Sequence, residues 1–144
     1  MNLPSLLNLS LKSDELIELF ELYEVEVVYA YDRLYEGTED KYYGSIYDLG
    51  LEFSFDHEQI LKTIFVFMNT TEEYQAASLS KLGIDEFSDK PSLLEHVKLN
   101  NLEFQEGEAE FLGEYRKWVK VIFDGHSIHY EYLKSGLSQV TFQA

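Results

Sequence analysis

The stretch WVKVIFDGHSIHYEY, residues 118–132, decides the fold. Apolar residues alternate with other residues on both sides of Asp124-Gly125, and a period of two is typical of a strand that buries one face. An Asp-Gly pair between two such runs is the signature of a two-residue type I′ hairpin turn. The stretch therefore predicts an antiparallel hairpin, and Ser135-Gly136 predicts the turn into one more strand.

Residue patterns predict helices and further strands in the rest of the chain. Helical spacing of apolar residues predicts a helix over 13–23 with Ser13 as its cap, and a second helix over 88–99 with Pro91 in its first turn. Thr70 and Glu73 have the spacing of a capping box, so the linker is also predicted to be a helix. Strands are predicted over 25–31, 42–47, 49–55 and 60–68.

The two halves of the chain correspond when one is displaced by 77 positions, as the pairs Leu16 with Leu93 and Phe53 with Tyr130 illustrate. Hydrophobic positions agree over about 50 residues, although few residues are identical and chance is the alternative. We therefore expect one compact domain, 1–144, made of internal repeats 1–68 and 69–144. The expected class is α+β: a tandem duplication of a helix-then-antiparallel-strands unit, with the helices packed on one side of the sheet.

Length and composition limit the possible classes of protein. The chain has 144 residues, of which 45% are hydrophobic, so a globular domain is expected. No apolar run approaches the roughly 20 residues that a membrane-spanning helix needs, and the N-terminus does not read as a secretory signal. There are no cysteines, which excludes disulfides and fits a cytoplasmic protein.

Charge indicates the kind of partner. Eleven Lys and Arg stand against 27 Asp and Glu, a formal net charge of −16. A field of this sign repels nucleic acid and anionic membranes, and it favours a basic protein partner by speeding encounter. The alternative is that the acidic surface serves only solubility.

The histidines do not form a local site. Alternation along the predicted strand puts His126 and His129 on opposite faces, so they cannot bind one metal, and neither His57 nor His96 has a partner at zinc spacing. Motifs for nucleotide binding, serine hydrolysis and zinc proteolysis are missing. We expect no catalytic residue, no metal and no cofactor; a site assembled from distant residues is the alternative.

Tyrosine gives the stronger functional signal. Seven of the eleven tyrosines fall between residues 23 and 47, interleaved with Asp and Glu. Tyr offers a large rigid contact area with one hydroxyl, and carboxylates complement Lys and Arg, whereas the alternative is that these tyrosines merely fill ordinary strands. The predicted partner-binding residues are Tyr29, Tyr31, Tyr35, Glu36, Glu39, Asp40, Tyr42, Tyr43, Tyr47, Asp48, Glu106, Glu108 and Glu110.

Two resemblances bear on function. The doubled layout, carried by the helix segments from Leu16 and Leu93 and the strand segments from Leu51 and Ile128, resembles β-lactamase inhibitory protein and more loosely the lipoproteins of outer-membrane assembly. The cysteines of those exported proteins are missing, so only the architecture is implied. The closing pattern FDGHSIHYEYLKSGLSQVTF, residues 123–142, looks like the ends of small acidic bacterial immunity proteins of polymorphic or contact-dependent toxins.

The sequence therefore favours a cytoplasmic immunity protein or inhibitor that binds and occludes a basic toxin domain, a nuclease above all. It would be a binding module rather than an enzyme, without nucleic-acid or membrane partners. Two alternatives stay open: a small carboxylate- or metal-dependent hydrolase, and a structural or assembly factor.

Overall fold

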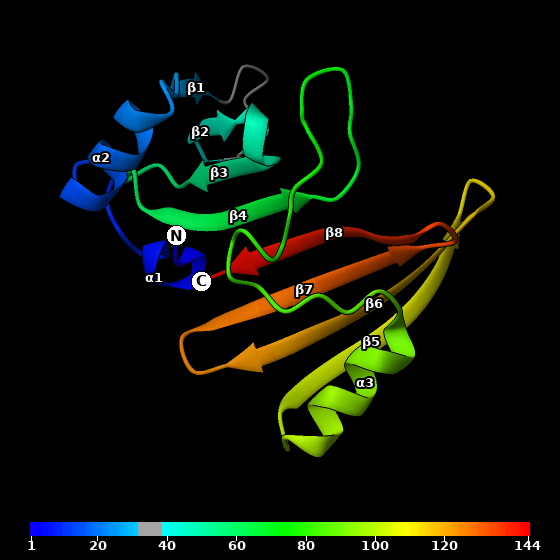
Figure 1. The fold of residues 1–144 in the computed structure, drawn as a ribbon. Helices are drawn as coiled ribbons and strands as arrows, with labels where there is room; N and C mark the ends of the chain where they lie inside the picture. The colour runs from blue at the N-terminus through cyan, green and yellow to red at the C-terminus, as the bar shows by residue number, and fades with distance from the viewer. Residues whose placement is uncertain (32–38) are drawn as a thin grey trace.

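The computed structural model describes residues 1–31 and 39–144, apart from the side chain of Phe111. The described part of the chain holds three α-helices and eight strands, which are labelled in Figure 1. In chain order they are α1 (Leu3–Leu6), α2 (Asp14–Leu22), β1 (Val28–Ala30), β2 (Lys41–Ile46), the 3-10 turn η1 (Tyr47–Leu49), β3 (Leu51–Phe55), β4 (Leu61–Phe67), α3 (Lys90–Leu99), β5 (Glu103–Phe111), β6 (Glu114–Phe123), β7 (His126–Leu133) and β8 (Gly136–Gln143).

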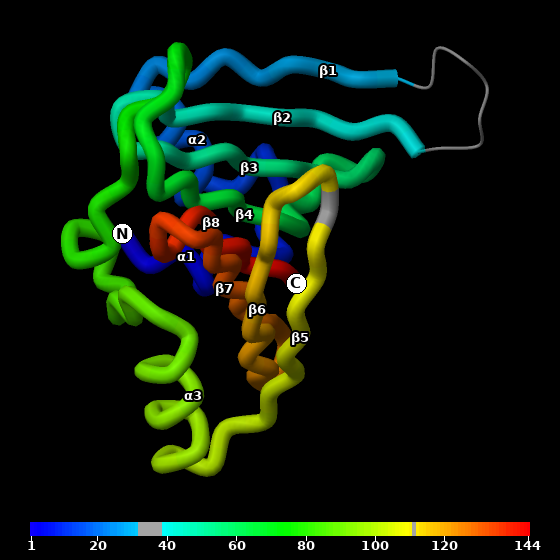
Figure 2. The backbone as a smooth tube through the Cα atoms, turned by 90° about the vertical axis from the view of Figure 1, so that its right-hand side faces the viewer, coloured from blue at the N-terminus to red at the C-terminus, as the bar shows by residue number. Residues whose placement is uncertain are grey.

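The eight described strands form one antiparallel sheet in the order β1-β2-β3-β4-β8-β7-β6-β5. The two sets of strands are joined in the middle of the sheet by β4 and β8, which pair Ile64 with Phe142 and Val66 with Val140. In Figure 2 strands β1 and β2 are horizontal, whereas β5 and β6 are nearly vertical. The strand direction therefore turns strongly from one edge of the sheet to the other, so the sheet is twisted. Strands β1 and β5 are its two edges.

The expected α+β class is wrong, because the protein is nearly all β. Helix makes up only 19% of it. Helix α1 has four residues, α2 has nine and α3 has ten, whereas the sheet has eight strands. The strands of the second half are long, eight to ten residues each, and leave little sequence for helices.

The linker helix predicted from Thr70 and Glu73 is also wrong, since residues 69–89 hold no helix. The Thr70 hydroxyl accepts from the backbone N–H of Ala76, which is not a capping bond. The linker backbone instead forms hydrogen bonds with residues at the ends of β2 and β4. The N–H of Gln75 donates to the Tyr47 carbonyl, and the N–H of Ala77 donates to the Phe67 carbonyl. Tertiary contacts therefore override the helix propensity of the alanines.

One hydrophobic core lies beneath the sheet and draws on both halves. Leu16 of α2 and Leu93 of α3 are at most 1% exposed, and both belong to the same buried cluster as the sheet residues. Phe20 packs edge-on against Phe53, with ring centroids 5.3 Å apart. The core continues across the β4–β8 junction, so the chain folds around a single interior.

The two halves of the chain have the same order of elements. Each runs from a helix, α2 or α3, into four strands, and the two sets of strands meet at β4 and β8. Leu16 and Leu93 lie in α2 and α3, and Phe53 and Tyr130 lie in β3 and β7. Superposition of the halves as repeats stays a prediction.

The hairpin predicted at 118–132 is confirmed, with Phe123 opposite His126 across a two-residue turn. Its turn type is not the one predicted. Gly125 has a φ of +82°, but Asp124 is not among the residues with positive φ, and a type I′ turn needs positive φ at both central positions. Ser13 does precede α2, yet its hydroxyl makes no capping hydrogen bond.

We expect Gly125→Val to lower the free energy of unfolding by about 1 kcal/mol or more, because a β-branched residue is strained at positive φ. Gly125→Asn is the matched control, since Asn tolerates this region and is expected to lose much less. Urea unfolding followed by the fluorescence of Trp118, the single tryptophan, measures both. Equal stability of the valine variant and the parent protein would contradict the turn.

No helix within the described ranges is long and apolar enough to cross a membrane.

Candidate functional site

The predicted contact residues are divided between the two edges of the sheet. Those from Tyr29 to Asp48 that the structure describes lie on or beside β1 and β2, at one edge. Glu106, Glu108 and Glu110 lie on β5, at the other edge. The two groups are thus separated by the whole sheet and do not form one contact surface.

A cluster of tyrosines lies at the β1–β2 edge, where Tyr29 contacts both Tyr31 and Tyr42. The Tyr29 ring stacks on Tyr31 with centroids 5.9 Å apart, and it lies 5.0 Å from the ring of Tyr42. Tyr29 and Tyr31 are about half exposed, at 48% and 53%. We call Tyr29, Tyr31 and Tyr42 the tyrosine cluster.

A carboxylate fixes the orientation of this cluster. The Tyr29 hydroxyl donates to the Asp40 carboxylate at 2.5 Å, and this hydrogen bond raises the pKa of Tyr29 to about 12. The hydroxyl therefore stays protonated at a pH where a free tyrosine has begun to lose its proton. An exposed aromatic surface with a carboxylate beside it suits an Arg or Lys side chain, whose cation is attracted to the ring faces.

A groove at the same edge is lined by acidic residues. It has a volume of about 280 Å³, and its walls include Tyr23, Glu24, Glu26, Tyr47 and Asp48. All five are exposed. The ring of Tyr47 packs against the ring of Tyr74, with centroids 5.0 Å apart. We call this the acidic groove; its three carboxylates and two phenol rings have the chemistry that a basic side chain requires.

Three of the five residues that define the acidic groove were not predicted from the sequence. Tyr47 and Asp48 were predicted contacts, but Tyr23, Glu24 and Glu26 were not, because that segment read as the end of a helix and the start of a strand. In the structure β1 begins only at Val28, which leaves residues 24–27 as an irregular edge beside β2. A signal did exist in the run of acidic residues that leads into this segment.

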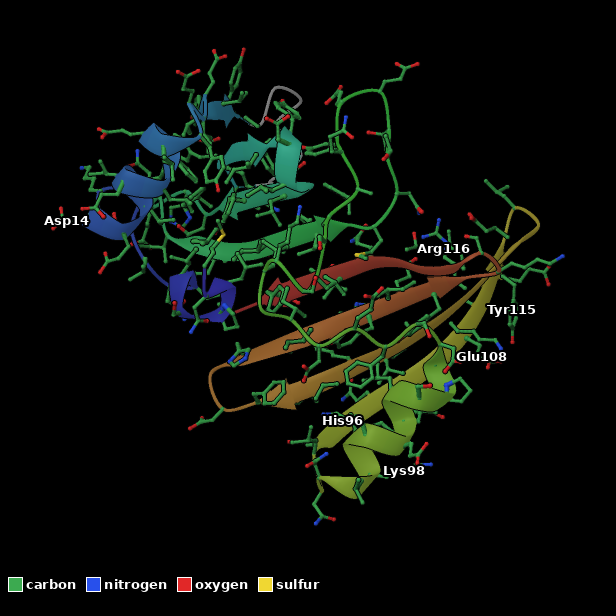
Figure 3. All side chains as sticks on the ribbon, in the orientation of Figure 1. Asp14, His96, Lys98, Glu108, Tyr115 and Arg116 are labelled. Atoms are coloured by element: carbon green, nitrogen blue, oxygen red, sulfur yellow. The ribbon has the colours of Figure 1, made fainter. Side chains whose placement is uncertain are left out.

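That run continues over the outer surface of α2. Residues 14–26 hold six carboxylates and no Lys or Arg: Asp14, Glu15, Glu18, Glu21, Glu24 and Glu26. Within the described part of the chain, none of the six lies in an ion pair. Figure 3 shows Asp14 at the outer end of α2, pointing away from the sheet. The described residues therefore supply no direct counter-ion to these six carboxylates.

Two further predicted residues near this edge, Tyr43 and Glu39, have contacts of their own. Tyr43 pairs with Val28 and Ser54 in the ladder and is half-buried, and alternation sends its side chain to the face opposite Tyr42. Glu39 is paired with His57 at 3.1 Å. Tyr35 and Glu36 lie outside the described residues.

Of the three predicted glutamates of β5, Glu108 has side-chain partners. The Glu108 carboxylate accepts a hydrogen bond from the Tyr115 hydroxyl, which lowers the pKa of Glu108, and the Lys90 ammonium lies 3.8 Å away. Glu106 is opposite Val119 and Glu110 is opposite Tyr115 in the β5–β6 ladder.

The histidines are placed as alternation predicts. Tyr130 is buried against Phe87, whereas the neighbouring His129 lies against Trp118 with ring centroids 5.4 Å apart. Burial lowers the pKa of His129 below its ordinary value. Among the residues that the structure describes, no group of three or more His, Asp or Glu side chains is arranged to hold a metal ion.

Comparisons of the chain with protein-family models, with curated proteins and with solved structures find no match. The resemblances drawn from the sequence therefore stay predictions.

Proposed function

We propose that this protein is a binding module that neutralises a basic protein partner by covering its working surface, in the way that a cytoplasmic immunity protein covers a cognate toxin. The observation that supports this most is the acidic β1–β2 edge, where the tyrosine cluster and the acidic groove adjoin α2, whose carboxylates form no ion pair with any described residue. Aromatic anchors beside uncompensated charge are what a tight interface with a cationic surface requires.

The acidic groove supplies the specific part of this recognition. Glu24, Glu26 and Asp48 surround a space that suits one Lys or Arg side chain of the partner. The tyrosine cluster then covers the neighbouring surface. Val28 of the groove and Tyr29 of the cluster are consecutive residues that point to opposite faces of β1, so a partner that straddles this edge contacts both.

The partner's chemistry follows from this surface. It should present Lys and Arg side chains on the surface that it uses in its own activity. A nuclease toxin has this property, because it must grip a phosphate backbone. An acidic inhibitor competes for the same cations, so occlusion and charge complementarity act together.

The test begins with co-purification. The tagged protein is incubated with extract of its source cells at low salt, and bound proteins are eluted with a salt gradient. We expect a basic protein that elutes with salt, that degrades nucleic acid when alone, and that is inactive once an equimolar amount of this protein is added. A captured protein whose activity is unchanged at a molar excess of this protein would contradict the proposed function.

A further inference from the structure

A second pocket lies on the other half of the molecule, between the start of α3, strand β6 and the β7–β8 turn. It has a volume of about 450 Å³, and three lysines line it: Lys90, Lys117 and Lys134. The chain has only 11 Lys and Arg against 27 Asp and Glu. We call it the lysine pocket; it brings together cations from three separate elements in a strongly acidic protein.

Lys90 shows why the pocket is unusual. It is the first residue of α3, and its side chain is only 9% exposed. Its ammonium donates to the Gly107 carbonyl at a long 3.4 Å and lies 3.8 Å from the Glu108 carboxylate. A buried ammonium carries three donors and is costly unless they are satisfied at close range. These two long contacts leave capacity for a further acceptor.

The carboxylates around the pocket do not cancel its lysines. Glu108 is also bound by the Tyr115 hydroxyl, and Figure 3 shows Glu108 and Tyr115 beside the start of α3. Asp89 accepts from the backbone N–H of Ser92 at 2.8 Å and so serves as the helix cap. Glu110 also lies near Tyr115, but Asp89 is the one carboxylate among the lining residues, so three lysines and one carboxylate line a locally positive pocket.

The other two lysines of the pocket can also donate hydrogen bonds to an anion. The Lys117 ammonium lies 5.9 Å above the ring of Tyr115. Lys134 is exposed in the turn before β8, and within the described ranges no ion pair holds it. Both side chains therefore have donors to offer to a ligand.

The remaining walls are mostly apolar. They include Pro91, Leu133 and the ring of Tyr132, whose hydroxyl already donates to the Phe87 carbonyl at 2.9 Å. A bare inorganic ion would use the lysines but not these walls. A ligand with an anionic head and an apolar or aromatic body would use both.

From these contacts we propose that the lysine pocket binds a small organic anion, a phosphate monoester or carboxylate with an apolar body. The head is held by Lys90, Lys117 and Lys134, and the body lies against Pro91 and Leu133. This site is independent of the acidic edge, which lies on the other half of the sheet.

The experiment uses phenyl phosphate and benzoate as probes, titrated into the ¹⁵N-labelled protein and followed by the backbone amide shifts of Lys117, Leu133 and Gly136. We expect saturable shifts at these positions with at least one of the two probes, and weaker binding of inorganic phosphate. Which probe binds identifies the head group. Failure of both probes to shift these amides would overturn the proposal, and so would inorganic phosphate binding as tightly as phenyl phosphate.

Two single variants assign the binding to the lysines. Lys117→Gln and Lys134→Gln are exposed changes that should leave the fold intact, and each should weaken binding about tenfold by removing a charge-assisted hydrogen bond. Lys12→Gln, which removes the same charge far along the chain, is the control and should bind as the parent protein does. Equal weakening by all three variants would mean that only net charge matters, and would overturn the site.

Discussion

We expect the double variant Tyr29→Ala/Tyr31→Ala to bind the basic partner about 30-fold more weakly or worse. The reason is that truncating an aromatic anchor at an interface typically costs about 2 kcal/mol or more. The two rings are stacked and half exposed, so they are preorganised to cover a cation without being needed for the core. The loss should appear mainly as faster dissociation, which surface plasmon resonance resolves from association.

Tyr115→Ala is the matched control for this experiment. Tyr115 is 45% exposed and its hydroxyl also donates to a carboxylate, that of Glu108, but it lies near the opposite edge of the sheet. It should leave the lifetime of the complex unchanged. If Tyr115→Ala weakened the complex as much as the double variant, the tyrosine cluster would not be the interface.

Replacing Phe53 by alanine is expected to lower the free energy of unfolding by about 3–5 kcal/mol, the usual cost of emptying a buried aromatic site. Phe53 is fully buried, faces Gly44 and Ile64 in the ladder, and packs against Phe20 of α2. With stabilities of small domains at about 5–15 kcal/mol, this loss brings the protein close to unfolding. Urea unfolding measures the change.

Phe65→Ala provides the comparison for Phe53. Phe65 lies on the adjacent strand β4, but it is only half-buried and faces the other side of the sheet. Its loss should cost clearly less, because the site that it leaves is open to water. Equal costs for the two variants would mean that the core does not lie on the α2 side of the sheet.

Elements with strong local signals could be predicted from the sequence. Pro91 at the start of α3, the alternation along β6 and β7, and Gly125 in their turn are all confirmed in position. Each of these signals depends on a few neighbouring residues. The local sequence is enough to determine these features, so they depend little on tertiary contacts.

The linker and the strand order could not be predicted, because long-range contacts decide both. Ala77 and Leu79 are drawn into the core, and the linker backbone bonds to the sheet instead of forming a helix. The β4–β8 pair joins residues more than 70 positions apart, such as Ile64 and Phe142, and no local pattern encodes that partner. The error in fold class follows from the same cause.

The candidate site was predicted in composition but not in shape. Tyr29 and Tyr31 are exposed at the sheet edge, yet alternation separates Tyr42 from Tyr43, and β5 lies with its glutamates at the opposite edge of the sheet. Glu24 and Glu26 of the acidic groove were missed because their role depends on where β1 begins. Position in the sheet, rather than residue type, decides which of these side chains act together.

The central claim is that the acidic groove recognises a cationic partner, and the association rate constant tests it most directly. It is measured by surface plasmon resonance at about 0.03 M and about 0.3 M salt, where screening differs widely. The parent protein is compared with Glu24→Lys/Glu26→Lys and with Glu95→Lys/Glu103→Lys, which makes the same charge change on exposed residues of α3 and β5. We predict that salt slows association of the parent protein and that the groove variant associates far more slowly than the control variant. Association that is independent of salt, or equal slowing by both variants, would contradict the account.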